Sequence, residues 1–325
     1  MKLSRRCCLS LLALTLFAPA TGAIAQAYPN KPIRLVVADA PGGAPDQLGR
    51  LLAQKFGDGL GQQVIVDNRA GAGGVLGAEM VAKSQADGYT LLLTTTAIYA
   101  ILPNLRKDLP YDPVRSFVPI SRIATASNVL VVNVDVPAKS IAELVKLAKD
   151  KPGVLNYASA GVGTPAHLAG EMLNLLADIK VTHVPYKGAA PALLDVIAGN
   201  AQYIITSPIA AGAHLSGGRV RALATTGGER NPGLPDLPTI GSTVPGYEIS
   251  QTWGIVAPAG TPPEIVARLS DEIVKAMNLA DVRERVLKTG AAPIGDRPAD
   301  FTAFMSNERQ RLGDVIARSG IVLTD

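Results

Sequence analysis

The sequence predicts an α/β protein of two domains, each with a mainly parallel sheet flanked by helices. Short apolar runs alternate with segments of helical spacing almost from end to end, a pattern typical of parallel strands that are covered on both faces. Two extended stretches, near 126–130 and 248–254, lack the usual helix between strands. We interpret them as crossings between the domains, which predicts hinge motion between two α/β units.

The first 27 residues have the pattern of an export signal. Basic residues precede an apolar run at 9–20, and Ala25 and Ala27 form a small-x-small cleavage site. This run falls short of the roughly 20 residues that span a bilayer. We therefore expect export and cleavage near Ala27, while Arg5 and Arg6 leave both general (Sec) and twin-arginine export open.

The mature chain has no cysteine, because Cys7 and Cys8 both lie in the predicted signal. This excludes disulfides, zinc–thiolate sites and cysteine catalysis. Loss of the three basic residues of the signal lowers the net charge from +4 to +1, which is too small for electrostatic attraction to nucleic acid. We expect no nucleic-acid partner.

The remaining chain is long enough for two domains of about 150 residues, each with its own core. The signal at 1–27 is followed by a first domain at 28–127 and 250–325, and the second domain at 128–249 is inserted into it. The predicted strands lie, in order, at 33–38, 63–68, 89–95, 128–134, 201–206 and 220–226. The predicted helices lie at 46–56, 140–150, 165–177, 191–200, 262–277, 280–290 and 298–320.

Pro41, Gly42 and Gly43 form a corner between the first predicted strand and helix. Glycine lets the backbone turn tightly and lets a ligand approach it closely, and N–H groups at a helix start attract an anion. A plain turn is the alternative. Asp46 is expected to cap this helix and orient the loop, or to accept a hydrogen bond from the ligand or a bound water.

Two further corners of this kind lie in the second domain. One follows a short strand and leads into a helix with Thr164 as its expected N-cap and Pro165 at its first position. The other precedes a helix that starts near Pro191. Corners in both domains predict an anion that is held from two sides. The residues expected to hold it in the second domain are Ser159, Gly161, Gly163, Thr164, Tyr186, Lys187 and Gly188.

Eight motifs follow one another along the mature chain: APGGAPDQLGR, VIVDNRAGAGGVLGA, DGYTLLLT, LPYDP, NYASAGVGTPAHLAGE, HVPYKGAAPAL, GRVRALATT and WGIVAPAGTP. This series resembles the Bug family, the extracytoplasmic solute receptors of tripartite tricarboxylate transporters. The resemblance implies a monomeric periplasmic binding protein of the Venus flytrap fold. It would bind a small mono-, di- or tricarboxylic acid, aromatic or aliphatic, without catalysis or cofactor and pass it to membrane transporter subunits. It also implies that backbone amides and water around the 41–43 corner hold the carboxylate.

The chain departs from the family pattern at two places. The family usually has His and Asn before LPYDP, where this chain has Tyr99 and Leu102 at the positions we align. It often has Phe-Asp-Asn at the positions where this chain has Ile205, Thr206 and Ser207. We expect Thr95, Tyr99 and Ser207 at the cleft. The lost polar groups favour a ligand with a less polar far end, such as an aromatic or longer aliphatic acid, over the alternative of a compact polar di- or tricarboxylate.

Gly71, Gly73 and Gly74 imitate a dinucleotide-binding fingerprint, but their spacing is not that of the fingerprint. We interpret them as a turn at the rim of the first domain and expect no cofactor. The histidines lack helical metal spacing, so no metal site is expected. His167 either faces the cleft or packs and caps its helix, and His183 is interpreted as structural.

Two residues have alternative interpretations that bear on function. Ser159 lacks the Gly-x-Ser-x-Gly elbow of a hydrolase nucleophile, so we expect no catalytic residue and keep a hydrolase as the enzyme alternative. Trp253 is interpreted as packing at the hinge, with a place in the cleft wall as the alternative. A ligand sensor that presents its closed form to a periplasmic sensor-kinase domain is the alternative to a transport receptor.

Overall fold

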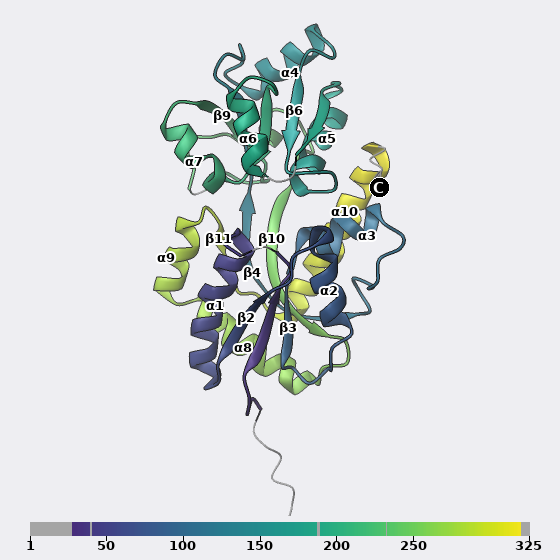
Figure 1. Cartoon of the computed structure of the whole chain (residues 1–325), viewed down its shortest axis with the longest axis vertical. Coiled ribbons are helices and arrows are strands. Elements are labelled where there is room, and N and C mark those ends of the chain that lie inside the picture. Colours follow the sequence, from purple (N-terminus) through teal and green to yellow (C-terminus); the bar gives the residue numbers. More distant parts are fainter. Residues whose placement is uncertain (1–27, 40, 187–188, 232, 320–325) are drawn as a thin grey trace, which may run out of the picture.

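Two β-sheets organise the protein. The computed structural model describes residues 28–39, 41–186, 189–231 and 233–319, and the predicted signal peptide lies outside these residues. The six-stranded sheet has the order β11-β4-β10-β3-β1-β2, and the five-stranded sheet has the order β7-β6-β8-β5-β9. We call the parts built on them lobe 1 and lobe 2. Figure 1 shows lobe 1 below and lobe 2 above, with β4 and β10 running between them.

The elements follow one another along the chain with these bounds. The strands are β1 (Ile33–Val37), β2 (Val64–Asn68), β3 (Thr90–Thr95), β4 (Phe117–Ser127), β5 (Val129–Asn133), β6 (Asn156–Ser159), β7 (Thr182–Pro185), β8 (Tyr203–Thr206), β9 (Val220–Thr225), β10 (Ser250–Pro258) and β11 (Ala292–Pro293). The helices are α1 (Ala44–Leu60), α2 (Val75–Ala82), α3 (Leu102–Leu105), α4 (Ile141–Asp150), α5 (Pro165–Ala177), α6 (Ala189–Ile197), α7 (Pro208–Ser216), α8 (Pro263–Met277), α9 (Ala280–Lys288) and α10 (Pro298–Ser319). Short 3₁₀ turns occupy η1 (Ala72–Gly74) and η3 (Ile240–Ser242), and η2 (Ala97–Ile101) is a π-helix.

The two-sheet α/β class is confirmed, but the prediction of mainly parallel strands is corrected because both sheets are mixed. In lobe 1, β1 pairs in parallel with β2 and β3, whereas β10 is antiparallel to both β3 and β4. In lobe 2, β6 is parallel to β7 and β8, and β5 is antiparallel to β8 and β9. The stretches interpreted as crossings overlap two strands, since β4 ends in the first stretch and β10 begins in the second. These strands are antiparallel, because β4 leads out of lobe 1 and β10 leads back into it.

Helices cover both faces of each sheet. In lobe 1, α1 and α8 bury Leu48, Phe56 and Ile273 against one face, while α2 and α10 cover the other. The ring of Phe301 on α10 lies directly on the sheet, since a Cβ at Gly254 would be 2.2 Å from it. In lobe 2, α4 and α5 cover one face, and α6 and α7 cover the other. No helix among the described residues combines the length and apolar content needed to span a membrane.

The lobes are joined by short backbone segments and by side-chain packing. At the crossings, Asn128 and Thr226 are linked by two hydrogen bonds of 2.9 Å, and the N–H of Ile249 donates to the carbonyl of Thr226. On one side, α10 extends from lobe 1 to pack on α5 (Figure 1). The strands on either side of these crossings belong to different sheets, while the exact domain limits stay a prediction. The carboxyl ends of β1, β3, β6 and β8 point toward the junction, where ligands of α/β proteins bind.

Candidate ligand-binding site

A cavity of about 460 Å³ lies between the two lobes. Its walls come from the ends of β1 and β3, from the loop before α2, from α3 and its C-cap, and from the start of α5. The described residues that line it are Ala38, Asp39, Ala70, Gly71, Ala72, Gly73, Gly74, Thr95, Ala97, Leu102, Arg106, Val162, Gly163, Thr164, Pro165 and Gln251. A volume of this size is typical of a site for a small organic ligand.

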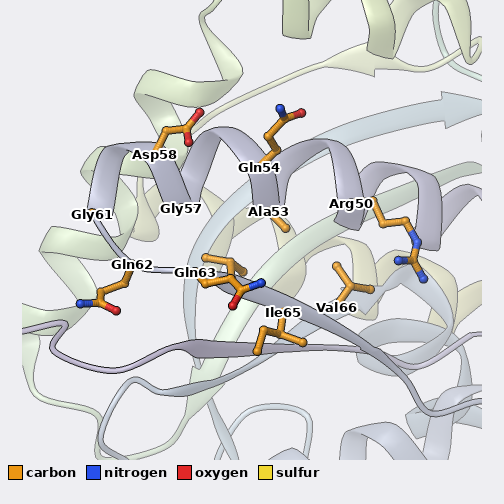
Figure 2. Close-up of a pocket in the computed structure, with 11 residues that line it drawn as sticks. Arg50, Ala53, Gln54, Gly57, Asp58, Gly61, Gln62, Gln63, Ile65 and Val66 are labelled. Carbon is orange, nitrogen blue, oxygen red and sulfur yellow. The ribbon is translucent and has the colours of Figure 1, made fainter.

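A larger groove of about 880 Å³ lies on the outside of lobe 1. Figure 2 shows it between α1 and the edge strand β2, with Gln54 and Asp58 above and Ile65 below. It is open, is lined by lobe 1 only, and lies along the C-terminal half of α1. The helix dipole makes that end unfavourable for an anion, so the cavity between the lobes is the better candidate.

The lobe 1 wall of the cavity is a loop at 71–74 that leads into α2. Gly73 and Gly74 have φ values of 67° and 101°, and Ala72 between the glycines also has a positive φ of 49°. Such a conformation favours glycine, and it exposes backbone rather than side chains to the cavity. Gly71, Gly73 and Gly74 do form the expected turn, and the sequence did not predict that this turn lines the cavity. These residues place the N-terminus of α2 at the cavity.

The lobe 2 wall is the N-terminus of α5. Thr164 caps this helix as expected: its Oγ1 accepts from the N–H of His167 at 3.3 Å and donates to the carbonyl of Gly161 at 2.7 Å. Gly163, with a φ of 77°, donates its N–H to Nδ1 of His167 at 3.1 Å. The N-termini of α2 and α5 thus meet at one cavity from opposite lobes. Their N–H groups and dipoles favour a negative charge between them.

A stack of aromatic rings supports the lobe 2 wall from behind. The ring of His167 lies 4.0 Å from that of His183 with an interplanar angle of 16°, and His183 in turn stacks on Tyr157 at 4.9 Å. Nε2 of His183 is hydrogen-bonded to Oγ of Ser159 at 2.6 Å. Burial, and then the proximity of His167, lower the pKa of His183 to about 4. Burial also lowers the pKa of His167, so both rings are neutral at pH 7.

Two predicted site residues, Ser159 and His167, are buried behind the wall, while half-exposed Tyr186 and Ser207 are not among the described residues that line this cavity. Ser159 has no exposed surface, and its Oγ accepts from the N–H of Gly161. His167 is 7% exposed and takes the packing and capping role that was its alternative. Tyr186 turns its hydroxyl to Asp195 on α6, and Ser207 is the N-cap of α7. Lys187 and Gly188 lie outside the described residues.

The 41–43 corner is not among the described residues that line the cavity. The N–H of Gly42 donates to Oδ2 of Asp46 at 2.8 Å, so one donor of this corner is already paired within the protein, while the role of the corner in ligand binding stays a prediction. Burial would raise the pKa of Asp46, but hydrogen bonds from Arg50 and Gly42 outweigh it and hold the pKa below its usual value. The expected loop-orienting contact of Asp46 is therefore present.

Tyr99 is a further correction. It is 1% exposed, its ring packs edge-on against Phe301, and its hydroxyl lies 3.3 Å from Oγ1 of Thr96. The π-helix η2 contains this residue, and its wider turn changes which side chains share a face. Leu102 and Thr95 do line the cavity.

A model of the tripartite tricarboxylate transporter family receptor matches residues 48–321. The chain belongs to this family. It is 36% identical to the protein BugT of Bordetella pertussis over 301 residues, 92% of each chain. The family has solved members of the same fold. One is Rpa4515 of R. palustris with adipate (35% identity, TM-score 0.82, 91% of this chain and 99% of that one). Another is MatC of Rhodopseudomonas palustris with bound malate (30% identity, TM-score 0.77, 89% and 100%).

The sequence analysis did not predict most of the residues that line this cavity. The missed positions include Asp39, the 71–74 loop, Arg106, Val162 and Gln251. The glycines at 71–74 were a usable signal for this part of the site. They form a Gly-rich loop directly before a helix, which is the same pattern that identified the other corners. Within the described ranges, no group of three or more His, Cys, Asp or Glu side chains is placed to hold a metal ion.

Proposed function

We propose that this protein is a periplasmic solute receptor that binds a small carboxylate between its lobes, as a monomer without catalysis, and delivers it to a tripartite tricarboxylate-type transporter. The observation that carries the proposal is the meeting of the α2 and α5 N-termini at one cavity. Family membership supports the receptor role. Adipate and malate in the two solved relatives support an organic acid as the ligand.

The energetics require both lobes to act together. A micromolar dissociation constant corresponds to about 8 kcal/mol. One helix N-terminus contributes about 0.3–2 kcal/mol, and a hydrogen bond to a charged group contributes about 1.5–3 kcal/mol. Several donors from both walls are therefore needed. Closure of the lobes would also exclude water and strengthen each of these interactions.

Isothermal titration calorimetry of the mature protein, with aliphatic and aromatic mono-, di- and tricarboxylates, tests the proposal. We expect micromolar or tighter binding of at least one acid, which is recovered chemically unchanged. Small-angle X-ray scattering should give a smaller radius of gyration with the acid than without it, because the crossings at Asn128 and Thr226 allow closure. Absence of binding across the whole series would refute the proposal. Loss of uptake of the bound acid in a deletion strain would distinguish transport from sensing.

A further inference from the structure

The last helix, α10, packs on both lobes. Its N-terminal half lies on the sheet of lobe 1, where Phe301 is fully buried. Its C-terminal half carries Leu312, Val315 and Ile316, which are all buried. These three side chains belong to the same apolar cluster as Leu168 on α5 of lobe 2. One apolar cluster therefore continues from lobe 1 into lobe 2 along α10.

A polar contact ties the same helix to the second crossing between the lobes. Nη1 of Arg311 donates to the carbonyl of Glu248 at 2.5 Å. Nε and Nη2 of Arg311 pair with the two carboxylate oxygens of Glu308, one turn earlier, at 3.0 and 2.7 Å. This bidentate pair fixes the plane of the guanidinium. Glu248 precedes Ile249, whose N–H donates to Thr226 of lobe 2, so Arg311 holds α10 to the segment that leads out of lobe 2.

The other side of the junction is held by smaller contacts. Figure 1 shows α10 and α5 on the right of the junction, and α7 and α9 on the left. On the left, Nδ2 of Asn231 in lobe 2 donates to the carbonyl of Gly290 at 3.5 Å and to Oγ of Ser127, at the crossing, at 3.1 Å. A Cβ on Gly290 would lie 3.4 Å from that of Pro208 at the start of α7, which is an ordinary van der Waals contact. A long hydrogen bond and a contact of this kind stabilise an interface less than three buried aliphatic side chains do.

We propose that the lobes rotate about the contact between α10 and α5, so that they separate on the α7–α9 side and stay together on the α10 side. Separation on the α10 side would expose Leu312, Val315 and Ile316 to water and break the contact of Arg311. Separation on the α7–α9 side only exchanges a long hydrogen bond for one to water. The N-terminus of α5 lines the ligand cavity, so Arg311 is a positioning residue for the lobe 2 wall. The pivot is a property of the ligand-free protein and holds whichever ligand the cavity takes.

Distances between pairs of spin labels test the proposal by double electron–electron resonance on the ligand-free mature protein. The chain after the predicted signal has no cysteine, so labels attach only to introduced ones. Ala303→Cys with Lys180→Cys spans the α10 side, and Glu284→Cys with Ala213→Cys spans the α7–α9 side, all at exposed positions. We expect the distance distribution across the α7–α9 side to be about twice as wide as that across the α10 side, because hinge displacement grows with distance from the pivot. Equal widths, or a wider distribution on the α10 side, would overturn the proposal.

Substitutions on α10 test the pivot itself with the same labels. Arg311→Gln removes the guanidinium that reaches Glu248, and Val315→Ala removes buried apolar area, so each should widen the distribution across the α10 side about twofold. Arg311→Lys should widen it less, because an ammonium can keep one of the hydrogen bonds. Arg318→Gln, at an exposed position in the last turn of the same helix, is the matched control and should change neither distribution. If Arg311→Gln and Val315→Ala both fold, as urea unfolding shows, and both leave the width on the α10 side as in wild-type protein, α10 is not the pivot. If either variant fails to fold, Arg311→Lys decides in its place.

Discussion

The backbone N–H of Gly163 donates a hydrogen bond to Nδ1 of His167, so a side chain on the first turn of α5 holds the loop that precedes the same helix. The acceptor nitrogen must be unprotonated for this contact to form. The neighbouring ring of His183 stacks on His167. The lobe 2 wall of the cavity therefore depends on two neutral imidazoles.

Acid should destabilise the protein and weaken ligand binding through these rings. The folded pKa of His183 is about 4, below the usual 6.5 of an unfolded chain. Between these values the unfolded state binds more protons than the folded state, so stability falls as pH decreases from about 6.5 to 4. Glu171, which accepts from the hydroxyl of Tyr157, opposes the shift at His167 without reversing it. Urea unfolding at a series of pH values measures the slope.

Two variants separate this effect from general acid sensitivity. His183→Gln should flatten the slope between pH 6.5 and 4. His214→Gln changes a histidine on α7, far along the chain from the stack, and should leave the slope as in wild-type protein. An unchanged slope in His183→Gln would show that the stacked rings do not cause the acid sensitivity.

A negative charge on the 71–74 loop should abolish binding of an acid. Gly73 lines the cavity with a φ of 67°, which Asp and Asn both tolerate better than other residues. Gly73→Asp places a carboxylate beside the N-terminus of α2, and we expect at least a tenfold loss of affinity in calorimetry, while Gly73→Asn is the neutral control of the same size.

The same substitution at the 41–43 corner gives the opposite expectation. Gly43 has a φ of −69°, lies outside the described cavity wall, and follows Gly42, whose N–H already donates to Asp46. Gly43→Asp should therefore keep near-native affinity. If Gly43→Asp abolished binding and Gly73→Asp did not, the 41–43 corner would be the anion site after all.

Removal of the Asp46 carboxylate should lower stability more than it lowers affinity. Asp46 is 4% exposed and holds both the N–H of Gly42 and the guanidinium of Arg50. Loss of a buried charged acceptor costs about 1–3 kcal/mol, which Asp46→Ala should show in urea unfolding at pH 7. Asp58→Ala, on the exposed end of the same helix, should cost less than about 0.5 kcal/mol. Equal stability of the two variants would count against a structural role for Asp46.

The single tryptophan should report ligand binding. Trp253 is 3% exposed and packs in the core of lobe 1, consistent with its interpretation as a packing residue. It lies opposite Thr95 in the pairing of β10 with β3, and Thr95 lines the cavity. Adding a bound acid should change its emission saturably, with the same dissociation constant as calorimetry. Trp253→Phe should lose the signal but keep binding. An emission that stays constant at saturating ligand would contradict this coupling.

The sequence by itself determined most of the local structure. All six predicted strands are present, since continuous apolar runs between turns identify buried strands without reference to the rest of the chain. The start of α5 at Pro165 with Thr164 as its N-cap was likewise readable, because a cap and its helix are neighbours in sequence. The family follows from motifs of the same local kind.

Only the tertiary structure decided which glycine corner meets the ligand cavity. The 41–43 corner and the 71–74 loop both lead from a strand to a helix, but their surroundings differ. In the 41–43 corner, the N–H of Gly42 is paired with Asp46. The 71–74 loop faces residues 162–165 of lobe 2 across the cavity. Tyr99 lies in a π-helix and turns into the core, which its alignment with a family position did not reveal. Arg106 lines the cavity from the end of α3, which packs against α10. Each of these depends on contacts between residues distant in the chain, and no local pattern encodes them.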